Sequence, residues 1–227
     1  MQQIMLQPKV YCSVNVLQTV FDAQRVCIGM RNRRQFITGA ATAGLLSLAG
    51  CAQSERASGQ PPDPVDLSGQ KTDFRGGMII GDHGGPNGQV FYQETEPKPR
   101  QGAGVAGDFP DTLGWFHTLV YGLFPYHFEM RNSGAEAAAI YVTDYSIVDW
   151  ELSSDAMTMP SPTSPKTFAD ATELTYVVGS DARGGMGATL LPFSNSDDAT
   201  RFTDEYNGRT ISYNAIDREL ISGMRRQ

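Results

Sequence analysis

The chain contains one long uncharged run, Phe36–Ala49, and the residues on either side of it decide which part of the chain can fold. Its fourteen residues are too few to cross a bilayer, because a helix needs about 20 residues to span the hydrocarbon core. The run fits the apolar centre of a signal peptide, with the basic pair Arg33-Arg34 before it and Cys51 after it. A buried helix of a folded domain is the alternative, but it does not explain these flanking residues. We therefore expect the folded domain to lie after Cys51.

The flanking residues also predict how the chain is exported and held. Arg33-Arg34-Gln35-Phe36-Ile37 resembles the twin-arginine export signal, which a receptor reads. Leu48-Ala49-Gly50-Cys51 resembles a lipobox, in which the cysteine is lipidated and the chain is cut before it. Together they predict a protein anchored by lipid at Cys51 on the outer face of the cytoplasmic membrane.

Segment boundaries follow from these signals. A signal peptide usually starts just before its basic region, and Met30 lies there. The residues before it are an extension from a misassigned start codon or an unusually long basic region. Cys12 and Cys27 belong to that stretch, so they do not predict a disulfide or a metal pair. The predicted segments are an N-terminal extension (1–29), a signal peptide (30–50), a lipidated cysteine with a flexible Ser-, Gly- and Pro-rich tether (51–72), and a folded domain (73–225).

Charge narrows the class of partner. The chain has 18 Lys and Arg against 25 Asp and Glu. Residues 1–51 have more basic than acidic side chains, so the net negative charge lies entirely after Cys51. Such a surface repels phosphate backbones, so we expect no nucleic-acid partner. An acid-rich domain with few lysines is also typical of proteins from high-salt environments.

The folded part shows one order of elements twice, strand, strand, helix, strand, which predicts an α+β fold of two related halves with antiparallel sheet (about 73–150 and 168–225). The tetrapeptide Arg75-Gly76-Gly77-Met78 recurs as Arg183-Gly184-Gly185-Met186 at what we take to be the same point of each half. The stretch 153–166 between the halves is rich in Ser and Pro and predicts a surface loop. The expected elements are strands at 78–80, 89–92, 138–145, 174–178, 188–193 and 209–213, and helices opening at 108–111, capped by 196–198, and covering 216–224.

The residues that could carry chemistry are few. No Gly-x-Ser-x-Gly, phosphate-binding Gly loop or His-Glu-x-x-His occurs, so we do not expect an enzyme. Thioether sulfur is a soft donor that suits Cu(I). Met78 and Met186 each follow paired glycines and could converge on one ion if the halves pack about a pseudo-twofold axis. Core filling is the other explanation for both methionines.

Several motifs, in this order, resemble the NosL family over about residues 74–224. The resemblance implies a membrane-anchored lipoprotein that binds Cu(I) and helps to mature nitrous oxide reductase, built from two related α+β halves. It also implies a copper-receiving partner, such as nitrous oxide reductase or its copper-loading transporter. The motifs are Gly77-Met78, Gly88-Gln89-Val90-Phe91-Tyr92, Phe109 with Asp111, Val142-Thr143-Asp144-Tyr145, Asp149-Trp150, Tyr176-Val177-Val178-Gly179-Ser180, Met186-Gly187 and Leu191-Pro192-Phe193.

One position departs from the family pattern. The first motif of the family is Cys-Gly-Met, and Gly76 stands here in place of its cysteine. By resemblance Met78 and Met186 carry over as copper ligands, while the thiolate does not. His83 is the nearest candidate replacement, although a histidine in a Gly-rich loop is commonly solvated.

Three further residues are candidates for the same chemistry. Met157 and Met159 form a Met-x-Met pair that could hand copper on, or that could simply fasten a loop to the domain surface. His117 falls at the edge of the helix expected after residue 111, where a partly buried imidazole is the default interpretation. The sequence thus leaves two functions open: a Cu(I) chaperone of NosL type, and a metal-free lipoprotein that keeps the fold for protein–protein contact.

Overall fold

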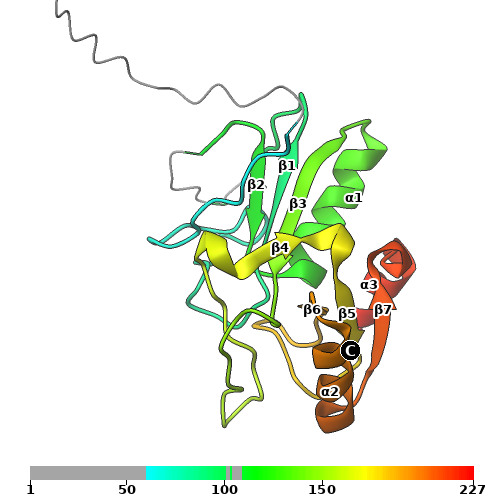
Figure 1. Ribbon diagram of the computed structural model, residues 1–227. Coiled ribbons are helices and arrows are strands. Elements are labelled where there is room, and N and C mark those ends of the chain that lie inside the picture. The colour runs from blue at the N-terminus through cyan, green and yellow to red at the C-terminus, as the bar shows by residue number, and fades with distance from the viewer. Residues whose placement is uncertain (1–59, 101–102, 104–108) are drawn as a thin grey trace, which may run out of the picture. The chain divides into compact units, whose positions relative to one another are not determined.

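The computed structural model of the chain describes residues 60–100, 103 and 109–227 (Figure 1). The predicted extension and signal peptide, with Arg33, Arg34 and Cys51, lie outside the described residues. No helix among the described residues has both the length and the apolar character needed to cross a bilayer.

The first half is a four-stranded antiparallel sheet in the order β2-β1-β3-β4. All five residues of the central strand β1 are buried, since β1 is covered on both faces. Gly88 of β1 lies opposite Phe116 of β2 on one side and Val142 of β3 on the other. The elements are β1 (Gly88–Tyr92), β2 (Leu113–Phe116), a π-helical turn η1 (Leu119–Leu123), α1 (Phe124–Asn132), β3 (Ala137–Thr143) and β4 (Phe168–Asp170).

Two local predictions for this half are wrong. Leu113–Phe116 is a strand and not the first turn of a helix, because its four residues are buried within the sheet. The helical segment starts only after Thr118, as the π-helical turn η1, and continues directly into α1, near whose start Pro125 lies. Met78-Ile79-Ile80 is no strand, since Ile79 makes only an isolated bridge to Thr72.

The second half is a three-stranded antiparallel sheet in the order β6-β5-β7. Helix α2 begins after Asn195, whose side chain accepts a hydrogen bond from the N–H of Asp197 at 2.9 Å. Asp217 caps α3 in the same way by accepting from the N–H of Leu220 at 2.8 Å. The elements are β5 (Thr175–Val178), β6 (Leu191–Phe193), α2 (Ser196–Tyr206), β7 (Arg209–Ser212) and α3 (Arg218–Met224), with short 3₁₀ turns η2 (Pro165–Thr167), η3 (Ala171–Glu173) and η4 (Tyr213–Ala215).

The two halves share one topology, which confirms the predicted α+β class and its internal repeat. In each half the first strand is central, the second strand pairs on one side of it, and the strand after the helix pairs on the other side. Strand β4 has no counterpart in the second half. The recurring tetrapeptide, however, does not occupy equivalent places: Met78 precedes the central strand β1, whereas Met186 follows the central strand β5.

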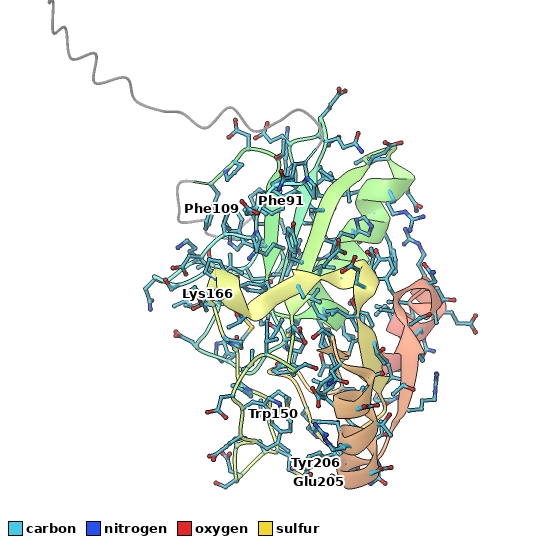
Figure 2. The ribbon with its side chains drawn as sticks, viewed as in Figure 1. Phe91, Phe109, Trp150, Lys166, Glu205 and Tyr206 are labelled. Atoms are coloured by element: carbon cyan, nitrogen blue, oxygen red, sulfur yellow. The ribbon has the colours of Figure 1, made fainter. Side chains whose placement is uncertain are left out.

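Side chains from both halves form the larger hydrophobic core. Phe124 of α1 faces Tyr176 of β5 with ring centroids 6.5 Å apart, and Met224 of α3 belongs to the same core. A second, smaller core lies under α2, where Trp150 packs against Phe202 at 5.5 Å and Tyr206 at 6.4 Å between ring centroids (Figure 2).

The segment before the first sheet is part of the domain. The side-chain amide of Gln89 in β1 both accepts from the N–H of Val65 at 2.9 Å and donates to its carbonyl at 2.8 Å. The hydroxyl of Tyr141 in β3 donates to the carbonyl of Pro62 at 2.8 Å, and Leu67 is fully buried. The domain therefore begins about ten residues before the predicted boundary at 73, and the tether is shorter than expected.

Candidate metal centre

The Gly-Gly-Met sequence lies in a tight turn that the carboxylate of Asp73 organises. Asp73 Oδ1 accepts hydrogen bonds from the N–H groups of Arg75 and Gly76, both at 2.6 Å. The backbone closes the same turn, since the N–H of Asp73 donates to the carbonyl of Met78 at 2.8 Å. Gly77 has a φ of +67°, which favours glycine at that position. Met78, which closes this turn, is half-buried.

The same carboxylate reaches the end of β2. Asp73 Oδ2 accepts from the backbone N–H of His117 at 2.8 Å and lies 2.9 Å from the imidazole Nδ1 of that residue. The ring N–H is poorly aligned with the oxygen, so the contact is mainly electrostatic. His117 therefore lies at the end of a strand, and not on a helix as the sequence suggested.

Burial and hydrogen bonding act in opposite directions on this carboxylate. Asp73 is fully buried, and burial favours its neutral form. Its contacts with the His117 imidazole and with the N–H groups of Gly76 and His117 prevail, and they hold the pKa of Asp73 below its ordinary value. Asp73 is thus a carboxylate that places negative charge behind the imidazole.

Gly76, at the position of the family's cysteine, faces both Met78 and His117. A Cβ at residue 76 would lie 3.8 Å from Met78 Cγ, 3.8 Å from His117 Cε1 and 3.6 Å from Asp73 Oδ1. These are ordinary van der Waals contacts, so the site has room for a side chain at this position. The side chains of Met78 and His117 therefore both lie beside position 76, where glycine leaves space for a side chain.

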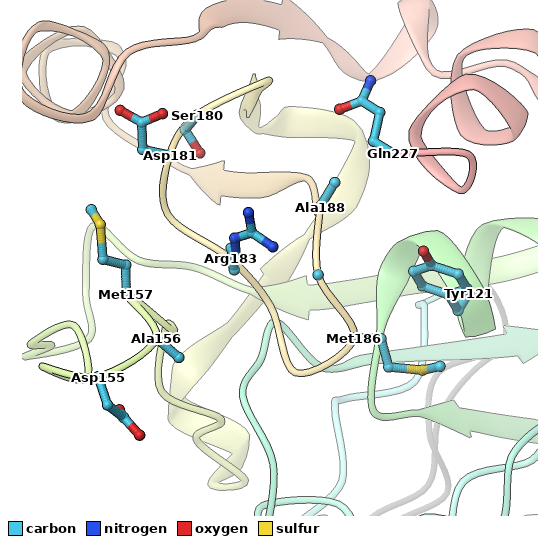
Figure 3. A pocket seen from close by; sticks show the side chains of 11 residues that line it. Tyr121, Asp155, Ala156, Met157, Ser180, Asp181, Arg183, Met186, Ala188 and Gln227 are labelled. Carbon is cyan, nitrogen blue, oxygen red and sulfur yellow. The ribbon is translucent and has the colours of Figure 1, made fainter.

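Met186 lies in the loop between β5 and β6, at the surface. This loop packs against the loop after Met78, where the N–H of Gly185 donates to the carbonyl of Gly84 at 2.9 Å. A Cβ at Gly185 would meet that carbonyl at 2.6 Å, so only glycine allows the two backbones to approach so closely. The side chain of Met186 is 43% exposed and lies beside Tyr121 of η1 (Figure 3).

His83 and Met157 lie on segments that flank this loop. A Cβ at Gly185 would lie 3.1 Å from His83 Cβ, and His83 itself is exposed. Met157 accepts from the N–H of Arg183 through its carbonyl at 2.9 Å, and it shares a surface depression of about 870 Å³ with Met186. In Figure 3 the two thioethers lie on opposite sides of Arg183 and point away from each other.

Met159 is separated from this surface. Its side chain is fully buried in the smaller core with Tyr145 and Phe193, which is a packing position. The structure therefore does not present Met157 and Met159 as an exposed pair, and residues 153–166 are not entirely a surface loop. In the described part of the chain, no three His, Cys, Asp or Glu side chains gather as a metal cluster.

Comparisons with known proteins bear on this arrangement. The sequence model of the NosL family matches residues 64–221. The copper-binding lipoprotein NosL of Stutzerimonas stutzeri is 28% identical over 174 residues, which are 77% of this chain and 76% of that protein. The crystal structure of the copper chaperone NosL from Shewanella denitrificans shares the fold with a TM-score of 0.51 and 20% identity, and the match covers 70% of this chain and 99% of the other. A family match over most of the domain, together with the shared fold, shows that this chain belongs to the NosL family.

Proposed function

We propose that the chain is a lipid-anchored Cu(I) carrier that acts outside the cytoplasmic membrane and passes copper to a receiving protein. The receiver would be nitrous oxide reductase or its copper-loading transporter, as the family resemblance implies. The observation that carries the proposal is the position of Met78, whose side chain borders the volume beside Gly76 together with His117. Thioether and imidazole are donors that suit a soft monovalent copper ion. Copper is cargo here, and no catalytic step is involved.

Met186 is proposed as a second sulfur donor or as the point of exchange with a partner. Its exposure at a rim next to Tyr121 supports access from outside. Its loop is fastened by backbone contacts to Gly84, six residues after Met78, which limits how far the two methionines can separate. Met157, on the other side of the depression, supplies a further exposed thioether for transient contact with copper.

The membrane anchor is proposed to be lipid on Cys51, after export directed by Arg33 and Arg34. The similar protein from Stutzerimonas stutzeri is a lipoprotein, which supports this assignment.

Copper competition tests the function. The thiol-free chain, in which Cys12, Cys27 and Cys51 are each changed to Ser, is purified in mild detergent and titrated anaerobically against a chromogenic Cu(I) chelator. We expect one Cu(I) to bind, and Met78→Leu to weaken its binding by about 10-fold or more, because leucine keeps the volume and removes the donor. Met186→Leu should weaken binding less if its sulfur serves mainly in exchange.

Met224→Leu is the matched control, since Met224 is a buried methionine of α3 in the large core. It should leave copper affinity unchanged. Failure of the unsubstituted thiol-free chain to bind Cu(I) would contradict the function. Equal affinity of the Met78→Leu and Met224→Leu variants would remove Met78 from the site.

The second candidate function is a metal-free lipoprotein that uses the fold for protein contact. Gly76 in place of the family's cysteine favours it, because the strongest soft ligand of the pattern is absent. The same titration separates the two functions, since a metal-free protein takes up no copper.

A further inference from the structure

We propose that Nε2 of His117 is a copper ligand that takes over the role of the missing thiolate beside Met78. The proposal rests on the proposed function and adds the identity of a ligand to it. The resulting site has a nitrogen and a thioether donor, and no thiolate, because the sequence after Cys51 contains no cysteine.

The first argument is that Nε2 of His117 is buried without a partner. The residue is 3% exposed, and Nε2 makes no hydrogen bond to any described residue. A buried ring nitrogen that forms no hydrogen bond lowers stability, so its position calls for an explanation. A metal ion on Nε2 would satisfy the nitrogen and supply that explanation.

The second argument is the carboxylate on the other side of the ring. Histidines that ligate metals commonly contact a carboxylate through their second nitrogen, which fixes the tautomer and raises ligand basicity. Asp73 Oδ2, 2.9 Å from Nδ1, favours the proton on that nitrogen and leaves the Nε2 lone pair available. His127, the other buried histidine of the described part, forms no ion pair with a carboxylate and stacks on Tyr92 at 6.2 Å between ring centroids.

The third argument is location. His117 Cε1, the ring carbon between Nδ1 and Nε2, lies 3.8 Å from the point where a cysteine at position 76 would place its Cβ. Met78 Cγ lies equally close to that point. An ion in the volume that glycine leaves free would be within reach of both side chains after small rotations.

Charge completes the argument. A thiolate would neutralise the single charge of Cu(I), whereas imidazole and thioether are neutral ligands. The buried carboxylate of Asp73, which accepts hydrogen bonds from three backbone N–H groups and lies 2.9 Å from Nδ1, supplies the negative charge through the imidazole. With glycine at position 76, the Asp73–His117 pair would thus supply both the ligand and the negative charge that a cysteine thiolate would provide.

The test uses the thiol-free chain and two matched substitutions of buried histidines. His117→Gln should weaken Cu(I) binding by about 10-fold or more, while His127→Gln should leave it unchanged. In the thiol-free chain that keeps both histidines, long-range ¹H–¹⁵N NMR should show the Nε2 resonance of His117 shifting when Cu(I) is added, while the Nε2 resonance of His127 does not move. X-ray absorption of the copper-loaded protein should show a nitrogen neighbour that disappears in His117→Gln.

A second variant distinguishes the loss of a copper ligand from the loss of the fold. Gly76→Cys fits without a clash, and in the His117→Gln background it should restore Cu(I) binding through a new thiolate. No copper binding by the unsubstituted chain would overturn the proposed function itself. Copper binding that is equal in the unsubstituted chain and in His117→Gln, with no shift of Nε2, would overturn only the role of His117. If His117→Gln does not fold, the NMR shift in the unsubstituted chain decides alone.

Discussion

At the scale of single residues, two buried polar groups are accommodated in different ways. Asp73 remains charged because three backbone N–H groups and an imidazole surround it. His127 has no such partners, and burial, helped by the positive charge of Arg131, lowers its pKa from the ordinary 6.5 to about 4. One group is kept ionised and the other neutral, so the two affect stability in different ranges of pH.

His127 makes stability depend on pH in mildly acidic solution. Between pH 6.5 and about pH 4 the unfolded chain binds a proton at this residue and the folded chain does not, so the free energy of unfolding falls as pH falls. The full effect is roughly 3 kcal/mol. Asp73 acts lower, because stability due to a depressed carboxyl pKa is lost only as pH falls below about 3.8.

Urea unfolding of His127→Gln and of the unsubstituted chain at several pH values measures this effect. The variant should lose clearly less stability between pH 6.5 and pH 4, since glutamine does not titrate. Parallel stability curves for the two proteins would contradict a neutral buried imidazole at this position.

At the scale of elements, the π-helical turn η1 packs on the central strand of the first sheet through a glycine. A Cβ at Gly88 would meet Leu123 Cδ1 at 2.2 Å, Leu119 Cδ2 at 3.1 Å and the carbonyl of Tyr141 at 3.2 Å. Both leucines are fully buried, so neither has free space to move into. The close packing of η1 on β1 thus requires residue 88 to lack a side chain.

Gly88→Ala should therefore destabilise the domain by about 2–3 kcal/mol, the usual cost of overpacking a core. Gly223→Ala is the control: it lies in α3, where a Cβ meets only Arg226 Nη2 at 3.8 Å. Alanine is the better helix former, so this variant should gain up to about 1 kcal/mol. Thermal or urea unfolding measures both, and a neutral Gly88→Ala would refute the packing argument.

The same scale shows why some elements could be predicted from sequence and others could not. Helix α2 could be predicted from local sequence, because capping residues precede it and its buried residues Ala199 and Phe202 lie on one face. Strand β2 and the helix after it form one apolar stretch, buried on every side, in which the helical spacing of Leu113 and Phe116 is accidental.

The candidate site divides in the same way. Met78 and the replaced cysteine at Gly76 are visible in a short motif. His117 could not be identified, because its environment depends on Asp73, which lies 44 residues earlier in the chain. A histidine within an apolar stretch was the available signal, and it gains meaning only when the carboxylate partner is known.

At the scale of the whole molecule, the two halves are joined by a common core, while the anchor depends on residues outside the described part. We predict that Cys51 is the mature N-terminus and that it carries the lipid. Mass spectrometry of the membrane-extracted protein should find a lipidated peptide beginning at Cys51. Lys in place of both Arg33 and Arg34 should leave precursor in the cytoplasm, and a mature chain that retains Phe36–Ala49 would contradict the anchor.

The hydrogen bond from the Tyr141 hydroxyl to the carbonyl of Pro62 limits the length of the tether between the anchor and the folded domain. With lipid on Cys51, Pro62, the point that is hydrogen-bonded to the sheet, lies only eleven positions further along the chain. Fully extended, this stretch spans at most about 40 Å. The domain would then stay within a thin layer above the bilayer, where its local concentration near membrane-bound partners is high. A receiver in that layer would meet the carrier repeatedly, whereas one free in the surrounding fluid would have to come to the membrane for its copper.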